Sequence, residues 1–210
     1  MYVENLFVCF SVPLCIALPF VEGGARHFCG FLLSGMTICL LTAYVNSFFM
    51  SVTGLSVDDT AIFITPICEE CMKLMPLLFY FLVFCPKDNS LLASAVAVGV
   101  GFATFENCCY LLSGETENLS YILIRGFAVG VMHIMCAVGV GFGLIFMTRV
   151  RHMAAVGALG ILALTVTFHA VCNLLVSVPG ISQSVSYSLP LLTAFIGFIA
   201  LSIYKKQTSK

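Results

Sequence analysis

Long apolar stretches separated by short polar segments make up almost the whole chain. A helix of about 20 apolar residues is long enough to cross the hydrocarbon core of a bilayer. The pattern therefore predicts an all-α integral membrane protein with about seven transmembrane helices in one bundle, forming a single polytopic membrane domain over residues 1–210. The predicted spans cover residues 6–21, 28–50, 61–84, 90–112, 121–147, 154–177 and 185–204.

The composition supports a membrane protein surrounded by lipid. Of the 210 residues, 60% are hydrophobic and 9% are charged, and the mean hydropathy is +1.09. These values lie well outside the range of soluble domains. The first stretch is short, but no basic segment or small-residue cleavage site accompanies it, so we expect a retained span and not a signal peptide. The basic residues are too few for a nucleic-acid site, and no nucleic-acid partner is expected.

The charges of the polar segments predict the orientation of the chain. With seven spans, basic residues gather on one side and acidic residues on the other. Because basic segments stay in the cytoplasm, we expect a multi-pass protein of the cell membrane with its N-terminus outside and its C-terminus in the cytoplasm. The basic side holds Arg26, Lys87, Arg149, Arg151, Lys205, Lys206 and Lys210. The acidic side holds Glu4, Asp58, Asp59, Glu115 and Glu117, with Arg125 as its one basic residue.

Cysteine is abundant, with 11 residues, but most of them lie within or beside the apolar stretches. This placement favours small core side chains over a secreted disulfide framework. Cys68 and Cys71 form a CxxC pair, but no second pair completes a zinc ribbon. Cys136 and Cys172 each follow a histidine by one helical turn, which leaves them as weaker candidate metal ligands.

Glycines recur where helices are expected to pack closely. Small residues allow the backbones of two helices in lipid to approach one another. We therefore interpret these glycines as packing residues, including the GxxxG pair of Gly126 and Gly130. The others are Gly99, Gly101, Gly139, Gly141 and Gly143.

Ionisable residues lie inside the apolar stretches on four successive predicted spans. They are Glu69, Glu70, Lys73, Glu106, His133 and His169. A charge in hydrocarbon costs at least about 2.5 kcal/mol, so such residues usually pair, line a wet cavity or take part in chemistry. With a rise of 1.5 Å per residue, all of them lie roughly 9–18 Å below the outer surface. Because the helices alternate in direction, this shared depth predicts one polar cavity that opens outward.

Spacing within the helices pairs some of these groups. Glu69 and Lys73 are one helical turn apart, in the favourable order for an ion pair on one face. His169 shares a face with Asn173, whose amide can orient the imidazole or hold a substrate oxygen. Such an isolated pair is usually a packing contact, but carboxylates at the same depth favour a site.

Carboxylates and imidazoles supply the groups that amide hydrolysis needs. The reaction requires a base for water, a proton donor for the leaving nitrogen and donors for the oxyanion. Adjacent carboxylates in a low dielectric resist joint ionisation, which leaves one of them available for proton transfer. Alternatively, carboxylates and two histidines bind a divalent metal that activates water. The residues are compatible with both mechanisms.

Four short motifs occur in order, each on its own predicted span. Residues 69–73 read EExxK, residues 101–107 read GFAxxEN and are followed by Tyr110, His133 precedes a glycine-rich stretch, and residues 169–173 read HxxxN. This ordered set resembles the PrsW family of intramembrane proteases, which are related to the type II CAAX prenyl endopeptidases. The resemblance covers about residues 61–177, which we take as the catalytic core.

The resemblance implies an endopeptidase that hydrolyses a peptide bond of a membrane-anchored, single-span protein near the extracytoplasmic side. The founding activity of the family is cleavage of an anti-sigma factor, so an anti-sigma-like substrate is one expectation. The implied catalytic residues are Glu69, Glu70, Glu106, His133 and His169, with Lys73, Asn173 and Asn107 supporting them. Glu69 and Glu106 would activate water. In a zinc-dependent mechanism, the implied ligands of Zn²⁺ are Glu69, Glu106, His133 and His169.

Two other functions use a polar cavity in a membrane bundle. A proton- or cation-coupled transporter also contains buried Glu, His and Lys, but its polar groups form a path through the bilayer, and no inverted repeat is visible here. A non-catalytic scaffold of the same superfamily, such as the Aph-type subunit of gamma-secretase, is the second alternative. Retention of all three glutamates favours the protease over this scaffold.

Overall fold

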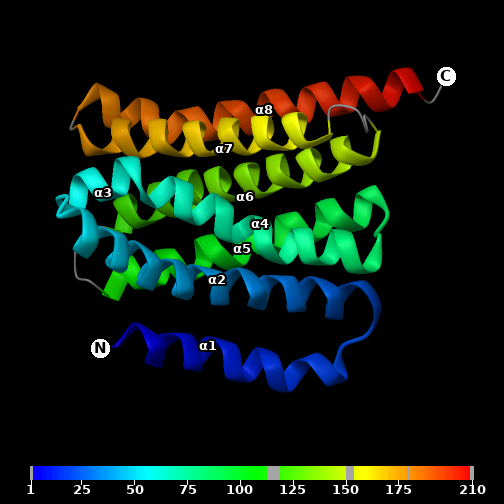
Figure 1. The fold of residues 1–210 in the computed structure, drawn as a ribbon, viewed down its shortest axis with the longest axis horizontal. Coiled ribbons are helices and arrows are strands. Elements are labelled where there is room, and N and C mark those ends of the chain that lie inside the picture. The colour runs from blue at the N-terminus through cyan, green and yellow to red at the C-terminus, as the bar shows by residue number, and fades with distance from the viewer. Residues whose placement is uncertain (1, 113–118, 150–153, 179, 209–210) are drawn as a thin grey trace.

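The computed structural model describes residues 2–112, 119–149, 154–178 and 180–208, and within these ranges the chain is helical and contains no β-strand. The helices lie side by side in one bundle (Figure 1). In chain order they are α1 (Val3–Ala17), the 3-10 turn η1 (Leu18–Phe20), α2 (Gly23–Thr53), α3 (Val57–Phe63), α4 (Thr65–Phe84), α5 (Asp88–Leu112), α6 (Leu119–Arg149), α7 (Ala154–Ser177) and α8 (Ile181–Thr208).

Five segments of the described chain are long and apolar enough to cross a membrane. They are Val3–Phe20, Gly23–Thr53, Asp88–Leu112, Ile122–Arg149 and Ala155–Ser177. The helix α4 is also long, with 20 residues, but it contains three charged residues, Glu69, Glu70 and Lys73, and is not among these five. The all-helical, multi-pass class is therefore confirmed, whereas the count of seven spans stays a prediction.

The third predicted span is divided at Ile64 into the short helix α3 and the longer helix α4. At the start of α3, the Ser56 hydroxyl accepts a hydrogen bond from the Asp59 N–H at 3.1 Å, which caps the helix. Pro66 lies in the first turn of α4, where its missing N–H needs no helical partner. These local signals make two helices from one apolar stretch, and α3 packs against both α4 and α7.

Glycines bring the central helices into close contact. A Cβ added at Gly101 would collide with the Leu32 carbonyl of α2, and one at Gly99 would lie 2.7 Å from Ile134 Cα of α6. These contacts confirm close packing at both glycines. Within the described chain, the packing interpretation is wrong for Gly126 and Gly130, since an added Cβ would meet nothing within 4 Å. This part of α6 faces outward, where neighbouring Phe127 is 69% exposed.

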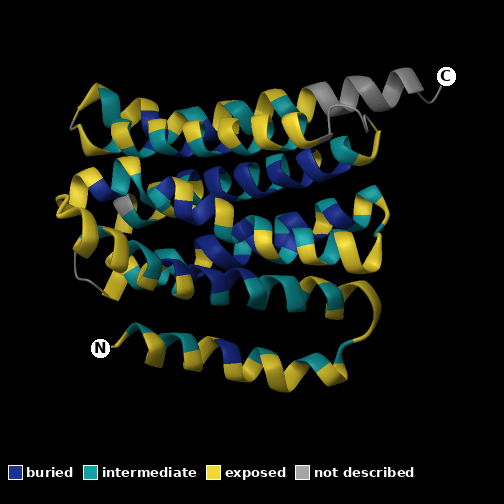
Figure 2. Ribbon diagram, viewed as in Figure 1, coloured by how far each residue is buried: buried dark blue, intermediate teal, exposed yellow. Residues whose placement is uncertain are grey.

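The most completely buried side chains lie on α4, α5 and α6, in the middle of the bundle (Figure 2). The helix α4 packs against α2, α5, α6 and α7, and so contacts most of the bundle. Large apolar side chains such as Phe79 and Phe195 cover the outside, which suits contact with lipid tails. The ionisable residues of α4 are therefore enclosed by helices and do not face lipid.

Charged residues of opposite sign lie at the two ends of the bundle. We call the end that holds α3 and the α7–α8 turn the α3 end, at the left of Figure 1. Asp58 and Asp59 lie in the first turn of α3. Arg26, Lys87 and Arg149 lie at the opposite end, where Arg149 pairs with Asp88 at 2.5 Å. Four loop and terminal charges used to predict the orientation lie outside the described residues: Glu115, Glu117, Arg151 and Lys210.

Candidate active site

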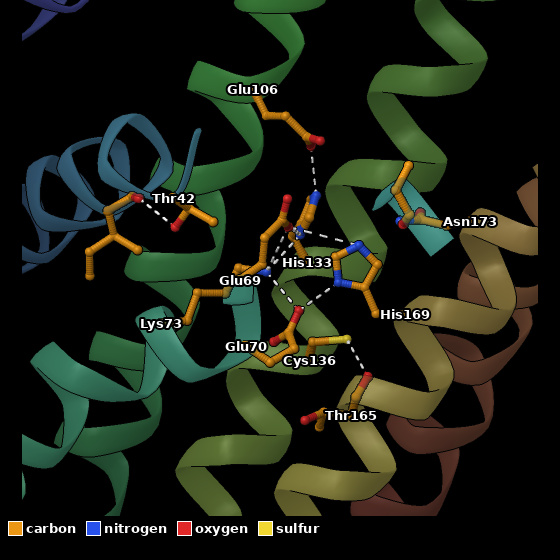
Figure 3. A network of polar contacts seen from close by, with 12 residues as sticks. Thr42, Glu69, Glu70, Lys73, Glu106, His133, Cys136, Thr165, His169 and Asn173 are labelled. Atoms are coloured by element: carbon orange, nitrogen blue, oxygen red, sulfur yellow. Dashed lines mark hydrogen bonds and ion pairs between the residues drawn. The ribbon is translucent and has the colours of Figure 1, made fainter. Parts of the chain in front are cut away.

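Four helices bring the predicted ionisable side chains into one cluster (Figure 3). The helix α4 supplies Glu69, Glu70 and Lys73, and α5, α6 and α7 supply Glu106, His133 and His169 in turn. All of them are buried except Glu106, whose side chain is 18% exposed. The convergence expected from their shared depth is thus present in the folded chain.

Glu70 and Lys73 form the innermost part of the cluster. The Lys73 ammonium donates to Glu70 Oε1 at 2.8 Å, and it also lies 4.2 Å from the centre of the Phe102 ring. His169 donates from Nδ1 to the same Glu70 oxygen at 2.8 Å. Both side chains of the ion pair are fully buried. Two donors therefore hold one carboxylate oxygen in place.

The partners of His133 determine its tautomer. Lys73 Nζ lies 2.8 Å from His133 Nδ1, and because an ammonium can only donate, Nδ1 must accept. The ring proton is then on Nε2, which donates to Glu106 Oε2 at 2.7 Å. His133 is thus a neutral bridge between a cation and a carboxylate.

Glu69 is the carboxylate of the cluster that lacks a close donor. Its Oε2 is buried and has no hydrogen-bond partner among the described residues. This oxygen lies 3.8 Å from His169 Nε2 and 3.9 Å from both His133 Nδ1 and Lys73 Nζ. The ion pair predicted between Glu69 and Lys73 is present at 3.9 Å, although the ammonium lies closer to Glu70, at 2.8 Å. Glu69 is left with an unshared oxygen that faces two imidazoles.

The cluster contains donors suited to a metal ion. Ligand atoms of Glu69, Glu70, His133 and His169 all lie within 4.8 Å of one another. Because His169 donates from Nδ1 to Glu70, the lone pair of its Nε2 is free for an ion, an arrangement common among histidine ligands. The second oxygen of Glu70, Oε2, is also buried without a hydrogen-bond partner in the described chain. These orphaned buried oxygens show that the residues fit a divalent cation.

This group differs from the metal ligands expected from the sequence by one residue. It contains Glu70 in place of Glu106. The reason is the orientation of His133, whose Nδ1 faces Lys73 and Glu69 while Nε2 faces Glu106. Glu106 therefore lies on the other side of the imidazole from the candidate ligands.

Arg125 belongs to the site, although the sequence pattern indicated only a basic residue on the acidic side of the membrane. Its guanidinium lies 3.5 Å from the centre of the Tyr110 ring, and its Nη2 lies 3.9 Å from Glu106 Oε1. Its position two helical turns before His133, on the same helix face, was the signal that could have identified it.

A cavity of about 560 Å³ adjoins the cluster. Glu69, Glu106, His133 and His169 line it, together with residues of α2, α3 and α8. Arg125 and Tyr110 also line this cavity, on the side towards the α3 end. The cluster thus borders a space that can hold a ligand.

The two asparagines expected to support catalysis do not hydrogen-bond to the cluster. Asn173 lines the cavity, but its amide donates to the Ala61 carbonyl at 2.9 Å, which ties α7 to α3. Asn107 is absent from the cavity lining, and its Oδ1 is buried without a hydrogen-bond partner among the described residues. Asn173 therefore positions a wall of the cavity.

The cysteines remain outside the metal-binding group. All 11 are free thiols in the structure. Cys136 and Cys172 pack with Met132 in an apolar cluster, and the Cys136 thiol lies 3.7 Å from the Thr165 carbonyl. Both face the core of the bundle and do not join the carboxylates and imidazoles.

The fold and the site together define a multi-pass helical membrane protein with a buried glutamate–histidine cluster that opens into a cavity. The sequence model of the PrsW family of intramembrane metalloproteases matches residues 24–202. The chain belongs to this family and is an intramembrane protease, a hydrolase that acts on a protein in a lipid environment. Searches of the curated proteins and of the solved structures found no significant match.

Proposed function

We propose that the chain cleaves a peptide bond in a single-span protein of the cell membrane, near its extracytoplasmic side. The main support is the buried cluster of Glu69, Glu70, His133 and His169, together with Glu106, next to a cavity of about 560 Å³. Family membership favours this function over a transporter or a scaffold. A membrane-anchored regulator such as an anti-sigma factor would be a substrate of this class.

We also propose seven transmembrane helices within one membrane domain, with the N-terminus outside and residues 61–177 as the catalytic core. The separation of Asp58 and Asp59 from Arg26 and Lys87 at opposite ends of the bundle supports this orientation. The cavity then opens towards the extracytoplasmic side, because it extends to the α3 end.

In this proposal, Glu69, Glu70, His133 and His169 hold a divalent ion, with Zn²⁺ as the metal that their oxygen and nitrogen donors suit. When bound, the ion would polarise the substrate carbonyl and make water more acidic. His133 Nδ1 can bind the ion only after its hydrogen bond with Lys73 is broken. His169 needs no such change, because Glu70 already orients its ring.

Glu106 is the proposed general base. It lines the cavity outside the metal-binding group, and only one of its oxygens accepts the hydrogen bond from His133. The carboxylate takes one proton from water as the hydroxide oxygen bonds to the scissile carbonyl carbon. The same proton then passes from Glu106 to the leaving nitrogen as the carbon–nitrogen bond breaks. Arg125, 3.9 Å from Glu106, keeps this carboxylate in place between proton transfers.

The test separates the base from the ligands by measuring cleavage and bound metal in the same samples. Purified wild type in lipid is compared with Glu106→Gln, Glu69→Gln and His169→Ala, using a library of single-span peptides. We expect all three variants to lose cleavage, but only Glu69→Gln and His169→Ala to lose zinc. Loss of zinc in Glu106→Gln would make Glu106 a ligand, and unchanged cleavage in every variant would exclude the proposed site.

A further inference from the structure

A second hollow lies on the lipid-facing surface of the bundle, between α6 and α8 at the α3 end. It has a volume of about 460 Å³, and we call it the α6–α8 groove. Its α6 side is formed by Leu123, Ile124 and Phe127, and Leu191 lies on the α8 side. These four apolar side chains are between 43% and 69% exposed.

The α6–α8 groove adjoins the catalytic cavity. Ala128 of α6 and Tyr187 of α8 line both of them. Ala128 is buried and has no side chain beyond Cβ, so Tyr187 supplies the bulk of the shared wall. A chain lying in the groove would therefore have a short path to Glu106 and His133.

The chemistry of the groove suits an apolar ligand from the lipid phase. None of the described residues that line it is charged. Its two serines donate to nearby backbone carbonyls: Ser184 to Gly180, which directly precedes α8, and Ser188 to Ser184 at 3.0 Å. Because these hydroxyl protons are already donated, a ligand in the groove does not have to supply a polar partner for them. The lining residues span about 8–11 Å along each helix, which corresponds to about two turns of a bound helix.

The backbone of α6 is also accessible beside the groove. Nothing lies within 4 Å of a Cβ added at Gly126 or Gly130, so this GxxxG pair packs against no other helix in the described part of the chain. Small residues at this spacing allow a second helix to approach closely in lipid. Together with the continuity to the catalytic cavity, this feature favours a helical occupant over an acyl chain.

We propose that the α6–α8 groove is the docking site for the transmembrane helix of the substrate, which reaches the catalytic cavity past Tyr187. This inference rests on the proposed cleavage of a membrane-spanning protein. The substrate helix lies against Phe127 and Leu191 in the bilayer. Its end near the membrane surface unwinds past Ala128 into the cavity.

Photocrosslinking tests docking without requiring cleavage. A benzoylphenylalanine replaces Phe127 in the groove or, as the matched control, Phe48 of α2, which is 61% exposed and near the same end of the bundle. Both proteins carry Glu106→Gln and are placed in phosphatidylcholine vesicles with a biotinylated peptide of one apolar transmembrane helix. We expect at least fivefold more labelling at position 127, with competition by the unlabelled peptide.

Three outcomes of this experiment would overturn the proposal. They are equal labelling at both positions, crosslinks only to lipid, and crosslinks only to a second copy of the protein. Because crosslinking reports contact and does not require turnover, a wrong assignment of the catalytic residues would leave this result unaffected.

A kinetic comparison adds a second readout in the active protein. Leu191→Trp fills the groove, whereas Leu192→Trp changes the neighbouring residue, which is 56% exposed and does not line it. For the membrane-spanning peptide, we expect Leu191→Trp to raise KM about fivefold with little change in kcat, and Leu192→Trp to change neither. Equal kinetics of the two variants would contradict docking in the groove.

Discussion

Replacing Lys73 with methionine removes the only ammonium in the described cluster while keeping a long side chain. Lys73 is fully buried, and its ammonium donates hydrogen bonds to Glu70 Oε1 and His133 Nδ1, each at 2.8 Å. Removing one partner of a buried ion pair costs about 3–5 kcal/mol, because the other charge stays buried without compensation. Glu70 retains the hydrogen bond from His169, so the lower end of this range, about 3 kcal/mol, applies.

The assay for this loss is thermal unfolding of the purified protein in detergent without metal. For a chain of this size, about 3 kcal/mol corresponds to a fall in Tm of about 6–12 °C. Lys87→Met is the matched control, because Lys87 is exposed at the α4–α5 turn. We expect Lys87→Met to leave the Tm unchanged.

The same variant should bind zinc more tightly. Loss of Lys73 frees the His133 Nδ1 lone pair and removes a positive charge 3.9 Å from Glu69 Oε2. A unit charge at about 4 Å contributes up to about 4 kcal/mol at an effective dielectric constant of 20, so at least a tenfold gain in affinity is expected. Zinc should therefore raise the Tm of Lys73→Met more than that of wild type. A Tm within 2 °C of wild type, with unchanged zinc affinity, would refute the reasoning about both the ion pair and the competition.

Three further substitutions test how the helices and the mouth of the cavity position the site. Gly99→Ala should lower stability by about 1–3 kcal/mol and reduce kcat, because the new methyl group meets the backbone of α6. Gly160→Ala in α7, whose added Cβ meets nothing within 4 Å, should change neither in unfolding and cleavage assays. Asn173→Ala should lower stability by about 1 kcal/mol through the lost bond to α3 while kcat falls less than tenfold; a hundredfold loss of kcat would instead give Asn173 a direct role. Arg125→Gln should lower kcat at least tenfold by releasing Glu106, and Arg125→Lys should restore part of it; equal kcat in wild type and both variants would contradict a positioning role.

The helical class and the convergence of the polar groups could be predicted because both depend on position along a helix. An apolar stretch predicts a buried or lipid-facing helix from its length alone. The depth of Glu106 or His169 follows from the number of residues to the end of the helix, with a constant rise per residue. Neither prediction requires knowledge of which helices are neighbours.

Several features of the site could not be predicted because they depend on rotation about the helix axis and on the neighbouring helix. The expected pairing of Lys73 with Glu69 was incomplete, since the ammonium lies closer to Glu70 and also reaches His133 on another helix. The HxxxN spacing placed Asn173 beside His169, yet the amide turns to a carbonyl of α3. For Lys73 a contact with another helix was added to the contacts within α4, and for Asn173 a contact with another helix replaced the expected one.

The amino-acid sequence alone predicts a multi-pass helical membrane protein and the small set of ionisable residues that share one depth, because hydropathy and helical rise are local properties. The packing of the helices determines which carboxylate oxygens remain unpaired, that Arg125 lies beside Glu106, and that Gly126 and Gly130 face open space. Those outcomes depend on how helices distant in the sequence rotate and pack, which is settled by contacts such as that of Gly99 with α6. Local pattern therefore supplied the chemical groups, and packing supplied their geometry.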